Sequence, residues 1–306
     1  MRNLSIYLTL LGVMIIWGLN VSAIKILVES FPTILIQAVR VFMAGIVVFI
    51  ALGVMKKLRK PNKKEYVYIV FGGLLNVTAH HLFLGLGLSN TSAVNGGLIL
   101  GMGPLLTALM AILFIGTRLT MVRSIGFISG GIGIAFIVLG GGEGLSGISL
   151  GDLYVFLSIL AQAASFILIS KAAKTMDPRL LTGYMLIFGS VVLIMVGSVL
   201  EPEGIINGLM NATLVQWLIL LGSAVFATAL GHMVYNHAVG KVGPAETSIF
   251  LNLNTFFSLL GAALFLGEKV TSFHLYGLIF IIIGVLFGSG ALEEIQLRRR
   301  SAKNVA

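Results

Sequence analysis

The chain carries one stretch of sequence twice. Residues 93–137 align without a gap to residues 244–288 at a constant shift of 151 positions. Apolar bias alone can match one leucine with another, but it does not align three glycines and a threonine at a single offset. The sequence therefore predicts two similar halves, and this repeat constrains the fold before any other feature. The identical pairs include Ala111 and Ala262, Leu113 and Leu264, Phe114 and Phe265, Gly116 and Gly267, Thr120 and Thr271, Gly126 and Gly277, Ile128 and Ile279, and Gly133 and Gly284.

The composition places both halves in a membrane. Of the 306 residues, 58% are hydrophobic and only 10% are charged. A soluble domain carries about 25% charged residues, so this chain cannot cover its surface with polar groups in water. The absence of cysteine excludes a disulfide framework and a thiolate metal site. We therefore predict an all-α integral membrane protein.

Ten segments are long and apolar enough to span a bilayer, since one spanning helix needs about 20 mostly apolar residues. The first segment reads as a span rather than a signal peptide, because no small-residue cleavage site accompanies it. Pro32, Pro178 and Pro244 lie at helix starts, where a missing N–H costs nothing, and only Pro104 lies inside a span. The predicted spans are residues 4–26, 33–55, 66–87, 92–115, 122–141, 150–171, 180–200, 214–238, 244–266 and 273–291.

Lysine and arginine are distributed unevenly among the connecting segments. With the N-terminus inside the cell, the inner segments hold 17 of these residues and the outer segments hold two, Lys25 and Lys269. By the positive-inside rule, both termini are expected in the cytoplasm. Five spans in each half is an odd number, so the halves should enter the membrane in opposite senses, as in inverted-repeat transporters. The predicted divisions are residues 1–141 as the first repeat, 142–149 as a linker, 150–291 as the second repeat and 292–306 as a basic cytoplasmic tail.

Several short motifs, in this order and spacing, resemble the EamA-like ten-helix group of the drug/metabolite transporter (DMT) superfamily. The first repeat departs from the family pattern at Thr117, where the family often has glutamate. The resemblance implies transport of small organic molecules, often the export of amino acids or related metabolites, and names no single substrate. The motifs are Trp17-Gly18-Leu19-Asn20 running to Lys25, Gly103-Pro104-Leu105-Leu106-Thr107-Ala108, Gly151-Asp152-Leu153 and Leu266-Gly267-Glu268-Lys269-Val270-Thr271.

Polar side chains inside the predicted spans fall into stripes at helical spacing. Polar groups are costly in hydrocarbon, so such stripes usually face a cavity or the bundle interior. The resemblance implies that spans one, three, four, six, eight and nine line the cavity. Spans five and ten are nearly free of polar groups at depth, so they are expected to form scaffold or a dimer surface. Single serines read more readily as packing groups that bond between helices, whereas function is favoured for Asn20, His80, His232 and Asn236. The candidate substrate-binding residues are Trp17, Asn20, Asn76, His80, Phe83, Gln162, Ser165, His232, Tyr235, Asn236 and Asn252.

Two further residues inside spans invite specific expectations. Pro104 removes a backbone hydrogen bond, so it is expected to kink the fourth span and to act as a hinge. Arg40 is the one basic residue well inside a span. Two interpretations of Arg40 stay open: it snorkels to the outer interface or binds carbonyl groups, or it attracts an anionic group of the substrate.

Acidic residues are absent from the middle of the spans, because all eleven Asp and Glu lie in loops or at span ends. A membrane-embedded carboxylate that exchanges protons for a cationic drug is therefore missing. Proton coupling would have to use His80, His81, His232 or His237, of which the first three are the main candidates, since histidine titrates near pH 6.5. An uncoupled facilitator fits the sequence equally well. A site without fixed acids suits a neutral or zwitterionic compound better than a cation.

Together these features predict a multi-pass secondary transporter in the plasma or inner membrane. It should move a small organic metabolite, such as an amino acid or a related neutral or zwitterionic compound, by alternating access, with export favoured. The alternative is a non-transporting membrane protein that handles lipid or acts as a sensory or accessory subunit. An enzyme is not predicted, because the H-E-x-x-H and G-x-S-x-G motifs are missing. No cofactor, metal ion or nucleic acid is expected as a partner, and a homodimer is left open.

Overall fold

The computed structural model describes residues 2–116, 119–140 and 149–288, and all regular structure in these ranges is helical. The basic tail at 292–306 and, apart from Ser149, the linker at 142–149 lie outside the described residues. Within the ranges given, eight helical segments are long and apolar enough to cross a membrane, and two further apolar helices are shorter. The eight are Ser5–Ser30, Thr33–Val54, Glu65–Asn90, Ala93–Ile115, Leu150–Ala172, Pro178–Leu200, Leu214–Val242 and Glu246–Phe265.

Four of the long segments are continuous α-helices and four are interrupted. The continuous ones are α1 (Arg2–Ser30), α2 (Thr33–Val54), α8 (Leu150–Ala172) and α9 (Pro178–Leu200). Two are interrupted by a π-helix: α3 (Glu65–Gly72), η1 (Gly73–Ala79) and α4 (His80–Asn90), and α11 (Leu214–Gly222), η3 (Ser223–Gly231) and α12 (His232–Val242). Each of the other two is broken by a turn. One turn joins α5 (Ala93–Leu100) to α6 (Gly103–Ile115), and the other joins α13 (Pro244–Ser248) to α14 (Leu251–Phe265). The remaining helices are α7 (Met121–Gly140), the short α10 (Ile206–Met210) and α15 (Ser272–Gly288).

Local structure recurs at the offset at which the sequence repeats. A shift of 151 positions carries η1 onto residues 224–230, which lie inside η3. The same shift relates two pairs of residues before a helix in which each side chain accepts a hydrogen bond from the other residue's backbone N–H, and the second pair is a capping box. Asn62 and Glu65 exchange such bonds at 2.9 and 3.0 Å before α3, and Thr213 and Gln216 do so at 2.8 and 3.3 Å before α11.

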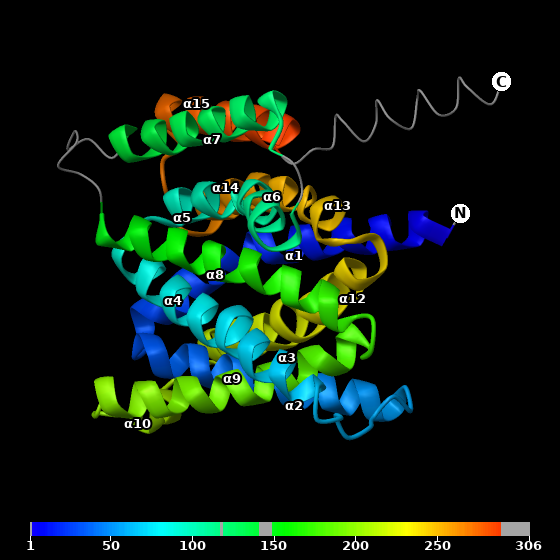
Figure 1. Cartoon of the computed structure of the whole chain (residues 1–306). Coiled ribbons are helices and arrows are strands. Elements are labelled where there is room, and N and C mark those ends of the chain that lie inside the picture. The colour runs from blue at the N-terminus through cyan, green and yellow to red at the C-terminus, as the bar shows by residue number, and fades with distance from the viewer. Residues whose placement is uncertain (1, 117–118, 141–148, 289–306) are drawn as a thin grey trace.

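The helices α7 and α15 form a pair on one side of the bundle, above α5, α6 and α14 (Figure 1). Their backbones approach closely because glycines line the crossing, as in other membrane helix pairs. A Cβ added at Gly126 would overlap the backbone of Gly288, and one added at Gly284 would crowd the backbone of Gly130. On the opposite side of the bundle, α2 packs along α9.

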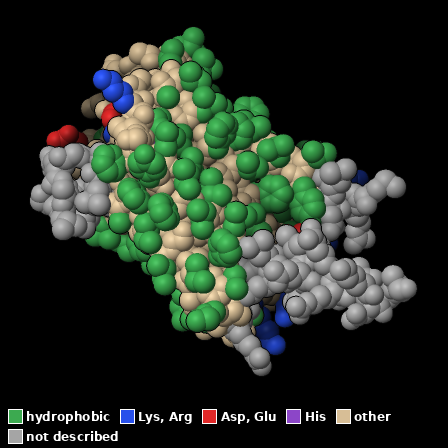
Figure 2. Space-filling model, turned by 90° about the horizontal axis from the view of Figure 1, so that it is seen from above, with side chains coloured by type: hydrophobic (Ala, Val, Ile, Leu, Met, Phe, Trp, Pro, Cys, Tyr) green, Lys and Arg blue, Asp and Glu red, His purple; other side chains and the backbone are tan. Residues whose placement is uncertain are grey.

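Hydrophobic side chains cover the face of the molecule that carries α7 and α15, with charged side chains only near its ends (Figure 2). Exposed residues on these two helices include Ile125, Ile128, Ile279 and Leu286. An apolar surface of this extent is unsuited to water and suits contact with lipid.

Two glutamates hold the starts of helices that are distant in sequence. Glu201 accepts hydrogen bonds of 2.9 Å from the backbone N–H groups of Ile34 and Leu35 at the start of α2. Glu268, in the L-G-E motif, accepts bonds of 2.9 and 2.8 Å from the N–H groups of Ala93 and Val94 at the start of α5. The first N–H groups of a helix have no partner within it and favour negative charge. Each carboxylate thus fastens one span end to another.

Candidate functional site

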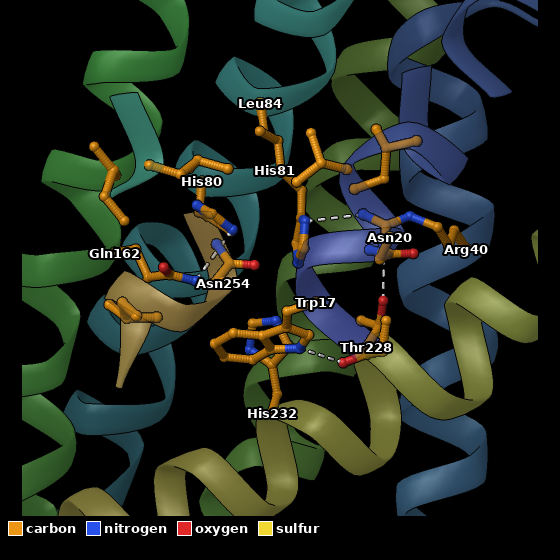
Figure 3. A pocket seen from close by; sticks show the side chains of 16 residues that line it. Trp17, Asn20, Arg40, His80, His81, Leu84, Gln162, Thr228, His232 and Asn254 are labelled. Carbon is orange, nitrogen blue, oxygen red and sulfur yellow. Dashed lines mark hydrogen bonds between the residues drawn. The ribbon is translucent and has the colours of Figure 1, made fainter. Parts of the chain in front are cut away.

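A pocket of about 50 Å³ lies among the middles of the long helical segments. It has room for a few water molecules. Its wall combines polar groups with aliphatic side chains from α1, α2, α4, α5, α8, η3, α12 and α14 (Figure 3). The lining residues are Trp17, Asn20, Val21, Ile24, Arg40, His80, His81, Leu84, Leu100, Ile159, Gln162, Ala227, Thr228, His232, Leu251 and Asn254.

Six of the residues predicted to bind substrate or couple protons meet in this pocket. They come from four segments that are far apart in the chain, and four of them are histidine or tryptophan. The rings of His81 and His232, which correspond at the 151-residue shift, lie 5.6 Å apart between centroids, and Trp17 lies 5.0 Å from His232. The six are Trp17, Asn20, His80, His81, Gln162 and His232.

His80 is held by α8 in one tautomer. Its Nδ1 lies 3.2 Å from the carbonyl oxygen of Ser158 and 2.8 Å from the Ser158 hydroxyl, and its Nε2 lies 3.1 Å from Nε2 of Gln162. The Gln162 amide nitrogen can only donate, so Nε2 of His80 accepts and Nδ1 carries the proton. His80 and Gln162 therefore form one fixed polar unit on the pocket wall.

Arg40 does not snorkel to the membrane interface, which corrects the first of the two expectations for it. Its side chain is 1% exposed and reaches into the pocket wall, because four neutral side chains surround the guanidinium. All five N–H groups have acceptors in this network, and Figure 3 shows the bonds to His81 and Thr228. Nε and Nη2 donate to Oε1 of Gln37, Nη2 also donates to Nδ1 of His81 at 3.0 Å, and Nη1 donates to Ser223 at 3.2 Å and Thr228 at 2.7 Å.

The three pocket histidines follow directly after the π-helices. His80 and His81 begin α4 after η1, and His232 begins α12 after η3. A π-helix adds a residue to the turn and is frequently found at functional sites. In η3 it also aims a carbonyl at a neighbour, since Ala227 O accepts a hydrogen bond of 2.7 Å from the Trp17 indole.

Five predicted residues lie buried or half-buried against neighbouring helices, away from the pocket wall. Each has a partner that explains its position. Asn76 donates to Ser165 at 2.7 Å, and Asn236 donates to Thr182 at 2.9 Å. Tyr235 packs 5.0 Å from both Trp17 and Phe166, and Phe83 stacks on Tyr154 at 6.0 Å.

Asn252 also stays away from the pocket wall, since its amide donates to the Ile249 carbonyl at 3.0 Å. Asn254, two residues later on α14, lines the pocket instead. The spacing in the sequence could have indicated Asn254, because Leu251, Asn254 and Ser258 share one helical face at spacings of three and four. In the structure all three are buried. Thr228 could have been predicted as a pocket residue in the same way, because it lies four positions before His232 in the sequence.

The predicted kink near Pro104 corresponds to a break in the fourth long segment. Helix α5 ends at Leu100, and α6 begins at Gly103 with Pro104 as its second residue. Between them, Gly101 and Met102 bond back to carbonyls three residues earlier, at 3.0 Å each. The structure thus interrupts the segment just before Pro104, while a hinge function for Pro104 stays a prediction.

Metal binding finds no support in this pocket. Across the described ranges, no group of three or more His, Cys, Asp or Glu side chains is arranged to hold a metal ion. Three imidazoles lie close together here, but two of them are already committed to hydrogen bonds with Gln162, Ser158 and Arg40. The arrangement is suited to binding a polar organic molecule.

A second pocket, of about 380 Å³, lies at the ends of α8, α9 and α12 and is strongly basic. Asp177, the N-cap of α9, bonds there to Lys57 at 3.2 Å and to Arg179 at 2.8 Å. Partial burial would raise the pKa of Asp177, but the hydrogen bonds from Arg179 and Lys57 outweigh it and hold the pKa below its usual range. The other charged or titratable side chains around it are Lys174, His237 and Lys241.

Comparison with known proteins gives concordant results. A model of the EamA-like transporter family matches residues 4–139 and again residues 149–289. The uncharacterized transporter YyaM of Bacillus subtilis (strain 168) is 28% identical over 300 residues, covering 96% of both chains. A WAT1-related chloroplastic protein of Arabidopsis thaliana is 25% identical over 275 residues, covering 88% of this chain and 66% of its own. A solved crystal structure shares the fold, with a TM-score of 0.65 at 15% identity over 94% of this chain and 97% of its own.

Proposed function

Because the chain belongs to the EamA-like transporter family, we propose that it is a secondary transporter of a small organic metabolite. The class we favour is an amino acid or a related neutral or zwitterionic compound, moved outward across the cell membrane by alternating access. The observation that carries this proposal is the buried polar pocket in the middle of an otherwise apolar bundle. Polar groups are costly at such depth and are typically kept there for a transport path.

The topology that goes with this function has ten spans in two inverted five-helix repeats, with both termini in the cytoplasm. The repeated sequence and the matching positions of η1 and η3 support two related halves. The unequal distribution of lysine and arginine supports the orientation. In inverted-repeat transporters the substrate site lies near the midplane between the halves, and this pocket takes residues from both.

Alternating access is supported by the size of the pocket and by the breaks in its walls. Pockets that hold drug-sized ligands measure about 300–1,000 Å³, so helices must separate before a metabolite enters a space of about 50 Å³. The long helical segments that line the pocket are interrupted by two π-helices and by two turns, at Gly101–Met102 and Ile249–Phe250. Such irregular points are where membrane helices bend.

We propose distinct roles for the pocket residues. Gln162 and the His80 unit, together with Asn20 and Asn254, bind polar groups of the substrate, and Trp17 forms an aromatic wall. Asn76, Ser165, Asn236 and Asn252 act through packing in this state. Proton coupling through His80, His81 or His232 stays a prediction, as does a homodimer through α7 and α15.

The lipid-handling alternative predicts a polar groove that opens to the bilayer. The open groove between α1 and the segment of α11 and η3 is instead lined mainly by apolar residues, including Ile16, Leu19, Leu218 and Phe226, with Asn20 and Ser223 as its polar residues. The three histidines, Gln162, Arg40 and Asn254 line the central pocket and not this groove. This separation favours a transporter.

An untargeted comparison of metabolites in the growth medium tests the proposed function. Cells expressing the intact chain are compared with empty cells and with cells expressing Gln162→Ala with His232→Ala. Ser190→Ala is the matched control, because Ser190 is buried and bonds only within its own helix, to Ile187. We expect one compound class to accumulate outside with the intact chain and the control, and not with the double variant. Identical media from expressing and empty cells would contradict transport.

A further inference from the structure

The positive charge of Arg40 is not balanced by an acid in the pocket. Among the lining residues there is no aspartate or glutamate, and every hydrogen bond of the guanidinium in the described structure goes to a neutral side chain. A buried charge without a counter-charge is costly. The pocket is therefore net positive and favours a ligand that brings a negative charge.

Arg40 cannot be the direct hydrogen-bond partner of that ligand in this state. Its five N–H groups are already used by Gln37, His81, Ser223 and Thr228. The hydrogen bond from Arg40 instead determines which nitrogen of the His81 imidazole carries the proton. An arginine only donates, so Nδ1 of His81 accepts from it and the ring proton sits on Nε2.

Nε2 of His81 is a buried donor without a partner. The side chain is 2% exposed and lines the pocket, and this nitrogen has no hydrogen-bond acceptor in the described structure. Buried polar groups are nearly always paired. A donor that faces a pocket next to a fixed positive charge points to an anionic acceptor.

We infer that this pair recognises a carboxylate, and that the transported compound is an organic acid or amino acid bound through it. This inference rests on the proposed transport function. His81 donates through Nε2–H to a carboxylate oxygen and so contacts the substrate. Arg40 is a positioning residue that fixes the tautomer and supplies the compensating charge.

The rest of the pocket accommodates a second polar group on the same molecule. The amide oxygens of Asn20 and Asn254 are buried and unpartnered in the described structure, and both residues line the pocket. They accept hydrogen bonds from a hydroxyl or ammonium group. The substrate class is therefore a carboxylate with a nearby donor, such as a 2-hydroxy or 2-amino acid.

Trp17 provides a reporter for this binding. The chain has two tryptophans, so Trp217→Phe leaves Trp17 in the pocket wall as the only one. The probes are three matched pairs of a carboxylate and its neutral amide: lactate and lactamide, 2-hydroxy-4-methylpentanoate and its amide, and 3-phenyllactate and its amide. We expect at least one carboxylate to change Trp17 fluorescence saturably, about tenfold more tightly than its amide. If no carboxylate binds more tightly than its amide, the inference is overturned.

Variants of His81 separate recognition from packing. His81→Leu should weaken carboxylate binding by about tenfold and leave the weak amide binding unchanged. His81→Gln should restore part of the affinity, because its amide nitrogen also donates. His237→Leu, on α12 outside this pocket, is the control and should bind normally. Equal losses for carboxylate and amide would show a packing role and contradict the inference.

The metabolite comparison distinguishes this inference from the transport function on which it rests. An exported compound that lacks a carboxylate would overturn the inference and leave transport standing. Carboxylate binding at Trp17 without any change in the medium would leave the recognition standing and contradict transport.

Discussion

Arg40 donates a hydrogen bond of 3.0 Å to Nδ1 of His81, which lies 41 positions later in the chain. This contact joins α2 to α4 at the pocket wall, and the bond from Arg40 to Thr228 joins α2 to η3. One guanidinium thus links three helical segments, and it leaves the outer nitrogen of His81 free to face the pocket. The contact between Arg40 and His81 therefore contributes both to the packing of the helices and to the hydrogen-bonding capacity of the pocket.

Removal of the Glu268 carboxylate should loosen the start of α5. Glu268→Ala leaves the N–H groups of Ala93 and Val94 without their acceptor, which should cost about 1 kcal/mol, as for other lost helix caps. Thermal unfolding in detergent measures the effect. Glu203→Ala is the control, because Glu203 is exposed. Equal melting temperatures for the two variants would contradict the capping role.

The close crossing of α7 and α15 should not tolerate a methyl group at Gly284. A Cβ there would meet the backbone of Gly126 and Gly130, so Gly284→Ala should destabilise the protein by about 1–3 kcal/mol. Gly131→Ala is the matched control on α7, because an added Cβ meets nothing within 4 Å. Unfolding of both variants under the same conditions should separate them, and an unaffected Gly284→Ala would contradict the packing.

Asp177 should stabilise the fold at neutral pH and lose this effect in acid. Its folded-state pKa is lowered by Arg179 and Lys57 despite partial burial, so the stabilisation is present above the unfolded pKa of about 3.9. It is lost as the pH falls through the lower folded pKa. Asp177→Asn should therefore be less stable than wild type at pH 7 by at most about 1 kcal/mol, since the pair is partly exposed. The difference should shrink below pH 4, and a difference that is constant with pH would contradict the account.

Pro104→Ala should stiffen the break between α5 and α6. The variant regains an N–H that can bond to the preceding turn, a gain of about 1 kcal/mol. If the break must bend during transport, the initial rate should fall about fivefold, while carboxylate binding at Trp17 stays unchanged. A variant that transports at the full rate would remove Pro104 as a hinge.

Eight of the ten predicted spans coincide with helical segments that are long and apolar enough to cross a membrane, and in the described residues the other two correspond to shorter apolar helices. The repeat pointed to corresponding histidines. The π-helices were not predicted, since residues 73–79 and 223–231 read from the sequence as parts of two continuous spans. This had a consequence for the site. Asn76 and His80 would share a face in a regular α-helix, but Asn76 lies inside η1 and His80 directly follows it. Asn76 donates to Ser165, while His80 lines the pocket.

The environment of Arg40 could not be read from the sequence either. Only Gln37 lies near it in the chain, whereas His81, Ser223 and Thr228 are brought to it by packing of distant helices. A lone arginine in a span is compatible with snorkelling or with a buried network, and tertiary contacts decide between them. The charge of the pocket, and hence the preference for a carboxylate, depends on this outcome.

Cysteine labelling from both sides of the membrane tests the central claim most directly. The chain has no cysteine, so Asn254→Cys places a single thiol in the pocket wall. Phe256→Cys on the same helix is the control, because Phe256 is exposed on the apolar surface. Alternating access predicts that a charged, membrane-impermeant thiol reagent modifies Asn254→Cys in right-side-out and in inside-out vesicles, and leaves Phe256→Cys unmodified in both. Modification of Asn254→Cys from one side only, or from neither, would contradict the account.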